Sequence, residues 1–188
     1  MNAVVIPLEE NCELRTWKDS EASALFALVD QNREYLGKWL PWVPFVKAEQ
    51  DSLKFIQESQ QSWEQQQSLE LGIWQGQTLL GCIGLHALDT LHRKTSFGYW
   101  LGARYQGQGV MTRAVTGLVT YCFSERDFNR VEIRAAVGNT ASRAIPERLG
   151  FTQEGILREA ELIREQYLDI VVYSMLRSEW KNHSTDFS

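Results

Sequence analysis

The sequence predicts a single α/β (α+β) domain built around one mixed sheet, and three observations predict it. Apolar residues alternate at period two in some segments and recur at helical spacing in others, and the two kinds of segment follow one another along the chain. The 188 residues contain no internal repeat and no linker rich enough in Gly, Pro or Ser to divide domains. Hydrophobic residues make up 44% and charged residues 23%, which is typical of a folded globular chain.

In the first half of the chain, a strand is expected over 12–17, followed by a helix that Asp19 caps. The inner face of this helix is predicted to carry Leu25, Phe26, Val29 and Leu36. The segment 39–45 is rich in aromatic residues, but its two prolines exclude a regular helix. A second helix is expected over 49–67, where apolar residues recur at the spacing of one helical face.

The second half alternates more regularly. A hairpin is expected because two alternating runs, 69–74 and 79–88, flank a Gln-Gly turn. The remaining expected elements are a strand over 95–101, a helix over 109–125, a strand over 130–137, a helix over 141–149, and strands over 152–158 and 167–176. The polar tail from Lys181 is expected to be frayed.

Composition excludes several classes of protein. The formal net charge of −5 argues against a protein that coats nucleic acid. The three cysteines are widely spaced, which excludes a zinc ribbon, and we expect three reduced thiols in the core of a cytoplasmic protein. The histidines, His86, His92 and His183, have no metal-ligand spacing. No signal peptide or membrane-spanning run is visible, so neither a membrane nor a direct nucleic-acid partner is expected.

The strand–loop–helix segment 99–112 is the most informative part of the chain. Gly107 and Gly109 let the backbone come close to a ligand, and a helix start supplies unpaired N–H groups at the positive end of its dipole. This combination favours a phosphate or pyrophosphate site over a loop that merely needs two glycines to turn. The Gly-Lys-Ser/Thr of an ATP-binding loop is absent, and Thr112 replaces the third small residue of a dinucleotide-binding loop.

Local charge supports an anion site. Between residues 104 and 148 there are seven arginines and four acidic residues, so this segment carries +3 while the rest of the chain carries −8. A positive region on an acidic protein attracts a polyanionic ligand. The acidic remainder suits a cationic amine or a basic peptide as a second ligand.

Several motifs in this half resemble those of one enzyme family. Gln106-Gly107-Gln108-Gly109 resembles the Gln/Arg-x-x-Gly-x-Gly/Ala loop of the GNAT N-acetyltransferases, whose backbone amides hold the pyrophosphate of acetyl-CoA. Asn139-Thr140-Ala141-Ser142 and Leu149-Gly150-Phe151 resemble two later motifs of that family, in the same order. The aromatic loop over 39–42 and the strand Gly98-Tyr99-Trp100-Leu101 resemble the RimJ/RimL-type enzymes, which acetylate ribosomal-protein N-termini. The resemblance covers nearly the whole chain.

The resemblance implies one N-acetyltransferase domain over 1–188, with a mostly antiparallel sheet of about seven strands and about four helices. It implies transfer of the acetyl group of acetyl-CoA to a primary amine, most simply the N-terminal α-amine of a protein such as a ribosomal protein. The alternatives are a small-molecule amine acceptor (a polyamine, an amino acid or an aminoglycoside) and a non-catalytic acetyl-CoA sensor. A homodimer is also implied.

The cofactor-binding residues implied by the resemblance lie on the strand end, the loop and the later helix. They are Trp100, Leu101, Gly102, Gln106, Gly107, Gln108, Gly109, Val110, Met111, Thr112, Asn139, Ser142 and Arg143. Met111 stands where the family loop has Gly or Ala. A backbone N–H near the strand end is the implied oxyanion donor, and Gly102 is expected to mark the place where two strands separate to admit the pantetheine arm.

The resemblance also implies the catalytic residues. Glu161 is the implied base, directly or through water, and Ser142 the implied acid toward the CoA sulfur. Without the resemblance, Glu161 is equally a solvated loop glutamate, and Ser142 part of a helix cap that begins at Asn139. At pH 7, deprotonating an α-amine costs about 1.4 kcal/mol and a lysine amine about 4.6 kcal/mol, so an α-amine needs only a weak base.

The acceptor is expected to bind beside Trp39, Trp42 and Trp100, whose alternative place is the core. Pro146 interrupts the helix that follows Ser142 and affects where Ser142 and Arg143 point.

Overall fold

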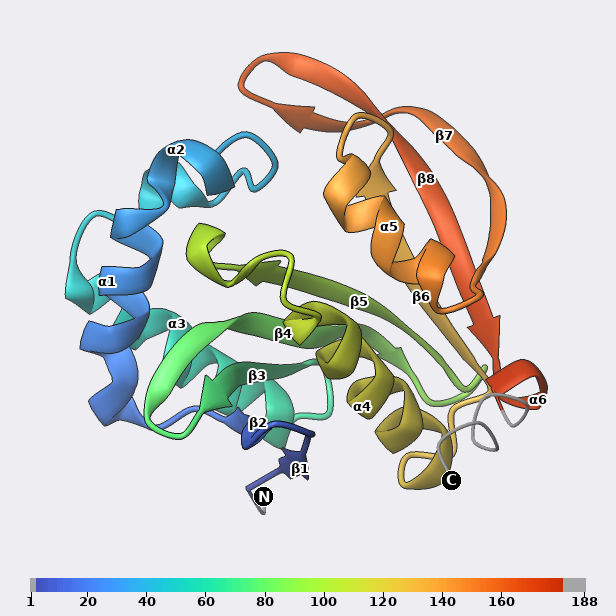
Figure 1. Ribbon diagram of the computed structural model, residues 1–188, viewed down its shortest axis with the longest axis horizontal. Helices are drawn as coiled ribbons and strands as arrows, with labels where there is room; N and C mark the ends of the chain where they lie inside the picture. Colours follow the sequence, from blue (N-terminus) through green and yellow to red (C-terminus); the bar gives the residue numbers. More distant parts are fainter. Residues whose placement is uncertain (1–2, 181–188) are drawn as a thin grey trace.

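The computed structural model describes residues 3–180, which form an eight-stranded sheet flanked by helices (Figure 1). The strands are β1 (Val5–Pro7), β2 (Cys12–Thr16), β3 (Leu69–Gln75), β4 (Thr78–Asp89), β5 (Lys94–Leu101), β6 (Arg130–Ala136), β7 (Thr152–Ile163) and β8 (Gln166–Leu176). The helices are α1 (Ala22–Gln31), α2 (Arg33–Leu36), α3 (Glu49–Glu64), α4 (Val110–Ser124), α5 (Thr140–Arg148) and α6 (Arg177–Trp180). The tail expected to fray from Lys181 lies outside the described residues.

The strand order is β1-β2-β3-β4-β5-β6-β8-β7, and every pair is antiparallel except β5–β6. The mixed, mostly antiparallel sheet is therefore confirmed. The prediction of about seven strands missed β1, because an apolar run of three residues is too short to signal a strand. Four helices have nine residues or more, and α2 and α6 are single turns of four residues.

The start of the first helix differs from the prediction. A 3₁₀ turn over Asp19–Glu21 precedes α1, and the side chain of Asp19 caps no helix. Its carboxylate instead accepts hydrogen bonds from Gln57 (3.2 Å) and Gln60 (3.1 Å) on α3. Leu36, expected on the same helix, belongs to α2, since α1 ends at Gln31. The aromatic segment after α2 forms no regular α-helix, as predicted, and contains a 3₁₀ turn over Val43–Phe45.

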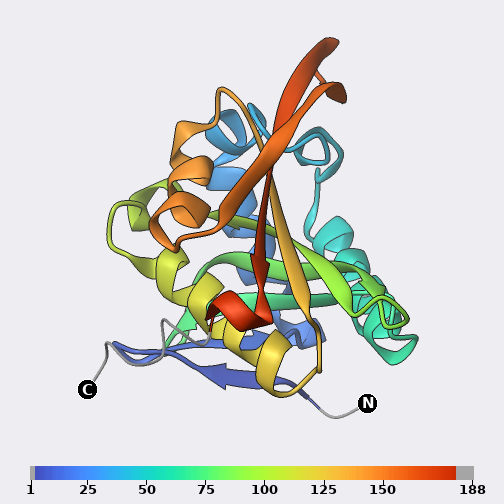
Figure 2. The ribbon, with the colours of Figure 1, turned by 90° about the vertical axis from the view of Figure 1, so that its right-hand side faces the viewer.

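One face of the sheet has a core along nearly its whole width, and the other face has a core over its first half only. Helix α4 packs on one face in a core that extends from Leu14 on β2 to Met175 on β8. Helices α1 and α3 pack on the opposite face in a second core, whose buried members all precede residue 83. Figure 2 shows α4 and α5 on one side of the sheet and α3 on the other. The three cysteines are buried and free, as expected.

The sheet divides between β5 and β6. Their parallel pairing runs only from Lys94 opposite Arg130 to Phe97 opposite Ile133. Beyond Phe97, β5 stays paired with β4 alone, while β6 stays paired with β8. We call this point the fork; Gly98 is the first residue of β5 past it.

The expectation that Gly102 marks the opening is wrong. Gly102 follows the end of β5, and its N–H donates to the carbonyl of Leu80 (2.9 Å). A glycine is required there by packing, because a Cβ on Gly102 would lie 2.9 Å from Leu28 of α1.

The last hairpin is longer than predicted. The strand expected to end at Arg158 continues to Ile163 as β7, after an irregular register between Leu157 and Glu161. Glu161 therefore lies on a strand and not in a loop. In the turn between β7 and β8, Arg164 lies against the end of α2. A Cβ on Gly37 would lie 2.6 Å from the Arg164 guanidinium.

Candidate active site

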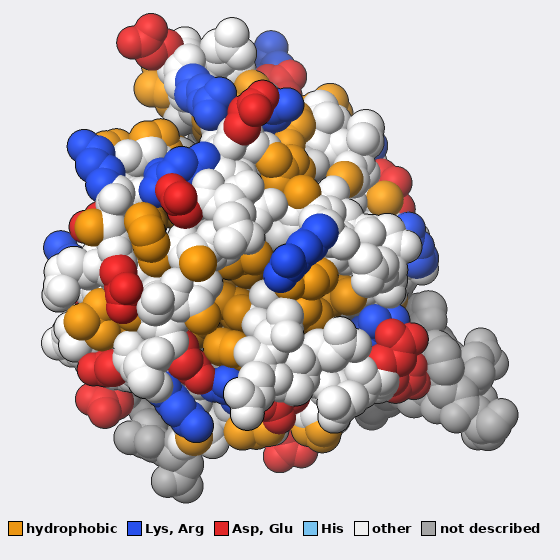
Figure 3. Space-filling view, turned by 60° about the vertical axis from the view of Figure 1, so that its left-hand side comes forward, with side chains coloured by type: hydrophobic (Ala, Val, Ile, Leu, Met, Phe, Trp, Pro, Cys, Tyr) orange, Lys and Arg blue, Asp and Glu red, His pale blue; other side chains and the backbone are white. Residues whose placement is uncertain are grey.

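A cavity of about 600 Å³ opens beside the fork, between α2, β5, α4 and α5. Its lining comprises Tyr35, Leu36, Trp39, Leu40, Tyr99, Trp100, Leu101, Tyr105, Gln106, Gly107, Gly109, Val110, Met111, Thr112, Arg113, Asn139, Ala141, Ser142, Ala144, Ile145 and Arg148. On the face shown in Figure 3, hydrophobic side chains are gathered in a hollow, with both basic and acidic side chains around it. The cavity is large enough for a small organic ligand.

The glycine loop forms one end of this cavity. Gly107 and Gly109 have φ angles of +71° and +73°, a region that residues with a side chain rarely adopt. Gly109 is the N-cap of α4, so the free N–H groups of the first helical turn begin at the cavity. This arrangement has the geometry that the sequence predicts for an anion site.

Two arginines that the sequence did not single out line the same end. Arg113 lies one turn into α4 and pairs with Glu10 across 2.8 Å. Arg148, at the end of α5, donates to the hydroxyl of Thr112 (2.9 Å). Both belong to the positive segment that the sequence identifies, but only the folded chain brings the end of α5 against the start of α4.

Ser142 lies at the cavity on the first turn of α5. Asn139 caps this helix, as expected, because its side chain accepts from the Ser142 N–H (3.2 Å). Pro146, inside α5, has no N–H to donate to the carbonyl of Ser142, four residues earlier. That carbonyl instead accepts a hydrogen bond from the Tyr99 hydroxyl of β5 (3.0 Å). The Ser142 hydroxyl lies 3.5 Å from the Tyr99 hydroxyl oxygen. Pro146 thus couples α5 to β5 across the fork without disrupting the helix.

Burial raises the pKa of Tyr99 to about 12, so its hydroxyl stays protonated at neutral pH and remains a donor. The neighbouring Arg143 points elsewhere. Its guanidinium donates to the Tyr173 hydroxyl (3.0 Å), the Val137 carbonyl (3.1 Å) and Glu147 (3.2 Å). Arg143 does not line the cavity.

The three tryptophans predicted for the acceptor lie close together. Trp39 and Trp100 line the cavity, and Trp42 packs against Trp100 with ring centroids 6.0 Å apart. A Cβ on Gly138 would lie 3.6 Å from the Trp39 ring, so this side chain reaches across to the loop that precedes α5. Trp42 and Trp100 also pack against the core beneath α1 and α3, so the cleft and core interpretations both hold in part.

Several expected site residues lie outside the cavity lining. Glu161 is exposed on β7, Gly102 packs against α1, and the side chain of Gln108 donates to the carbonyl of Arg104 (2.8 Å). Gln106 does line the cavity, and its amide donates to the hydroxyl of Tyr35. Within residues 3–180, no group of His, Cys, Asp and Glu could hold a metal ion, and no helix is long and apolar enough to cross a membrane.

The fold and this site define the class of protein. Residues 11–152 match the family described as an acetyltransferase (GNAT) domain, and the chain belongs to that family. It is an N-acetyltransferase of the class that uses acetyl-CoA, as the sequence motifs predict.

Particular relatives are similar over nearly the full length. The YdaF protein of Bacillus subtilis (strain 168), provisionally named a ribosomal N-acetyltransferase, is 37% identical over 179 residues, 93% of this chain and 96% of YdaF. The ribosomal-protein-serine acetyltransferase of Escherichia coli (strain K12) is 28% identical over 171 residues, 91% of this chain and 96% of that one.

A solved structure of RimL, the ribosomal L7/L12 alpha-N-protein acetyltransferase, in complex with coenzyme A superimposes with a TM-score of 0.89. It is 28% identical, with 92% of this chain and 98% of that chain covered. The acetyltransferase MccE, in complex with acetyl-CoA and AMP, gives a TM-score of 0.86 at 31% identity, covering 89% and 93% of the two chains. The predicted family and fold are thereby confirmed.

Proposed function

We propose that this enzyme transfers the acetyl group of acetyl-CoA to the N-terminal α-amine of a ribosomal protein, by direct attack in a ternary complex. The observation that carries this proposal is similarity to ribosomal-protein acetyltransferases over more than nine-tenths of the chain, including the whole cavity. The formal charge of −5, with positive charge concentrated in one segment, suits an anionic cofactor and a cationic acceptor.

The proposed orientation of the cofactor follows the two ends of the cavity. The pyrophosphate binds the N–H groups around Gly109, with Arg113 and Arg148 beside it. The pantetheine arm then follows the edge of β5 from Leu101 toward Gly98, which β6 leaves unpaired. An extended arm on an open strand edge satisfies the backbone groups as an added strand would.

The chemistry requires a neutral amine, a donor for the oxyanion and a proton for the leaving thiolate. The amine nitrogen forms a bond to the acetyl carbon, the C–S bond breaks, and one proton passes to the sulfur. Backbone N–H groups on the free edge of β5 are the oxyanion donors. Ser142, held by Asn139 and Tyr99, is the proposed donor to the sulfur.

Glu161 is the base that the sequence resemblance implies. Its exposed carboxylate lies on β7 and acts directly or through water. The carboxylates on this hairpin also attract a cationic N-terminus.

A small-molecule acceptor is the second candidate. The spermidine N(1)-acetyltransferase of Vibrio cholerae is 26% identical, but over only 56% of this chain. That shorter match supports the shared cofactor site more than a shared acceptor. A non-catalytic acetyl-CoA sensor would bind the cofactor and acetylate nothing.

Two measurements test this proposal. Calorimetric titration with acetyl-CoA should show binding that Gly109→Glu abolishes. Any side chain strains the left-handed φ of this residue, and the carboxylate of the new glutamate repels the phosphates. A panel of N-terminal peptides from ribosomal proteins, with spermidine, free amino acids and aminoglycosides, then identifies the acceptor. Turnover of small amines alone would contradict the ribosomal proposal, and cofactor binding without any turnover would favour the sensor.

We also propose a homodimer. Strand β7 is one of the two edge strands of the sheet, and Ile156, Leu157 and Leu162 on it are exposed. An unpaired strand edge with exposed apolar side chains favours association with another chain. Light scattering that reports a monomer at micromolar concentration would contradict this.

A further inference from the structure

A buried carboxylate and a histidine lie side by side on the sheet face opposite α4. Glu70 on β3 is 14% exposed, and its Oε1 lies 3.3 Å from the Nδ1 of His86 on β4. The other carboxylate oxygen accepts a long contact from the Cys82 thiol (3.6 Å). A carboxylate this close to Nδ1 favours a proton on that nitrogen, which leaves Nε2 as the basic nitrogen.

Two strand glycines make room for this pair. Glu70, Gly84 and Gly98 are register partners across β3, β4 and β5. A Cβ on Gly84 would lie 2.3 Å from the Glu70 carboxylate, and a Cβ on Gly98 would lie 2.6 Å from the Nε2 of His86. Glycine in a strand is unfavourable unless something must approach the backbone, and here two charged or polar side chains do so.

The position of His86 relative to the fork suggests its use. Its Nε2 lies over Gly98, the first residue of β5 past the fork. Trp100, two residues farther along β5 on the same face, lines the cofactor cavity, and two residues span about 7 Å of strand. An arm that enters at the glycine loop and follows the free edge of β5 therefore ends beneath His86.

We propose that His86, held by Glu70, is the group that accepts the proton of the attacking amine. The ammonium of the acceptor gives one proton to Nε2, and the Glu70 carboxylate stabilises the imidazolium. The neutral amine then attacks the acetyl carbon and its second proton goes to the leaving sulfur. His86 is about half exposed and returns its proton to solvent. The inference rests on the proposed transfer to an amine, but not on which amine is the acceptor.

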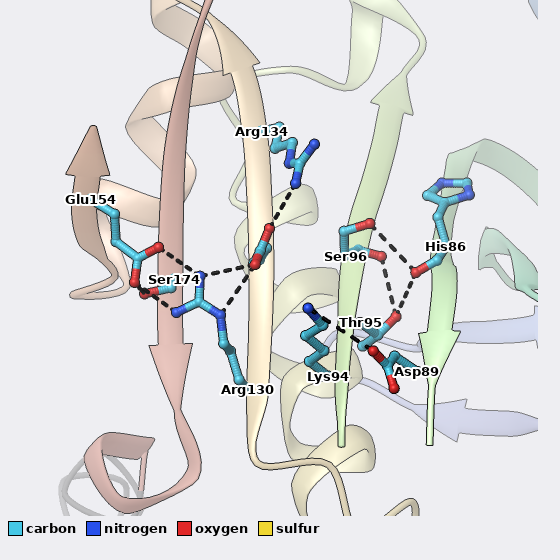
Figure 4. Close-up of polar contacts among 10 residues, drawn as sticks. His86, Asp89, Lys94, Thr95, Ser96, Arg130, Arg134, Glu154 and Ser174 are labelled. Atoms are coloured by element: carbon cyan, nitrogen blue, oxygen red, sulfur yellow. Dashed lines mark hydrogen bonds and ion pairs between the residues drawn. The ribbon is translucent and has the colours of Figure 1, made fainter. Parts of the chain in front are cut away.

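The charged groups nearest to Glu70 and His86 on this face are paired with one another. On the same face Lys94 pairs with Asp89, and Arg134 and Arg130 pair with Glu132 (Figure 4). From α3, Glu64 shares a small cavity with Glu70, and Cys82 is buried beneath it. Burial raises the pKa of Glu70 to about 7 and lowers the pKa of His86. Above about pH 7 the Glu70 carboxylate is therefore largely ionised and is able to stabilise a positive charge on the neighbouring imidazole.

The pH profile of His86→Gln tests the proposal, with whichever amine of the panel turns over. For an α-amine acceptor with a pKa near 8, loss of the group that takes its proton lowers kcat/KM by about 10-fold at pH 7, where only about one-tenth of the amine is neutral. The ratio to wild type shrinks to about one near pH 10, because the amine is by then neutral without help. Acetyl-CoA affinity stays unchanged. A loss of the same size at every pH would overturn the proposal, since that result indicates a structural role.

Two variants sharpen this experiment. His92→Gln is the matched control, because His92 also pairs with a carboxylate (Asp89, 3.1 Å) but lies in the exposed turn after β4. Its profile should coincide with wild type. Glu161→Gln should lower the rate without changing the shape of the profile; if Glu161→Gln removes the pH dependence and His86→Gln does not, the proposal is overturned.

A second readout needs no acceptor, so it stands even if the proposed transfer fails. Nitrogen chemical shifts of the His86 ring should show the proton on Nδ1 at pH 8 in wild type, and on Nε2 in Glu70→Leu. Glu70→Gln, which keeps an oxygen at this place, should preserve the Nδ1–H form. A wild-type ring protonated on Nε2 would overturn the proposal.

Discussion

The parts of the sheet on the two sides of the fork are stabilised in different ways. On the β1–β5 side, apolar side chains cover both faces of the sheet, with α4 on one face and α1 and α3 on the other. On the β6–β8–β7 side, only the α4 face contributes to a core. The opposite face carries a polar network in which Arg130 binds Glu132 and Glu154, and Ser174 donates to Glu154 (Figure 4).

This difference follows from what the fork must do. Two sides with continuous cores on both faces would close the gap that admits the pantetheine arm. A side anchored on one face only, and joined to β5 by four residues of parallel pairing, keeps its free edge. The open edge that can bind the pantetheine arm therefore exists because this side of the sheet has a hydrophobic core on one face only.

The largest expected effect lies on the doubly covered side. Ile56 of α3 is fully buried, and Ile56→Ala should lower the free energy of unfolding by about 2–5 kcal/mol. Val172→Ala on the open face of β8, where the side chain is partly exposed, should cost below about 1 kcal/mol. Urea denaturation measures both, and equal losses would contradict the comparison.

An intermediate effect is expected where the two sides meet. Tyr99→Phe removes the hydroxyl that donates to the Ser142 carbonyl, which should cost about 1–3 kcal/mol. The same change should lower kcat more than it raises KM for acetyl-CoA, because Ser142 loses its support. Tyr167→Phe, at an exposed tyrosine of β8, is the control. Unchanged stability in Tyr99→Phe would show that the fork needs no such link.

The smallest effect belongs to the polar network. Arg130 lowers the pKa of Glu154 from 4.5 to about 2. A lowered pKa in the folded state stabilises the protein above the unfolded pKa, and this contribution is lost as pH falls from about 4.5 to 2. Because both groups are partly exposed, Glu154→Gln should cost less than about 1 kcal/mol at pH 7 and nothing near pH 2. Glu58→Gln, in an exposed pair on α3, should cost nothing measurable at either pH.

Short-range patterns predicted most of the elements, and long-range contacts explain the failures. The strand after Phe151 was expected to end at Arg158, because Glu159 and Glu161 give no apolar alternation; β7 continues through them as an exposed edge held by β8. Asp19 has the right residue type for a cap, but Gln57 and Gln60 of α3 compete for its carboxylate.

The same limit applies to the site. The glycine loop and the Asn139 cap are local, so the sequence identified both. Arg148 beside Thr112 and Glu70 beside His86 join elements far apart in the chain, which spacing cannot reveal. One signal was present in the sequence, since Gly84 and Gly98 interrupt strands that otherwise favour larger residues.

The proline inside α5 has a consequence for how this protein can vary. Without Pro146, the Ser142 carbonyl would also accept the N–H of residue 146 and would depend less on a hydroxyl at position 99. The two positions, 47 residues apart in the chain, therefore depend on one another. Tyr99→Phe should be tolerated better with Ala at position 146 than with Pro, and relatives that lose the proline are free to lose the tyrosine.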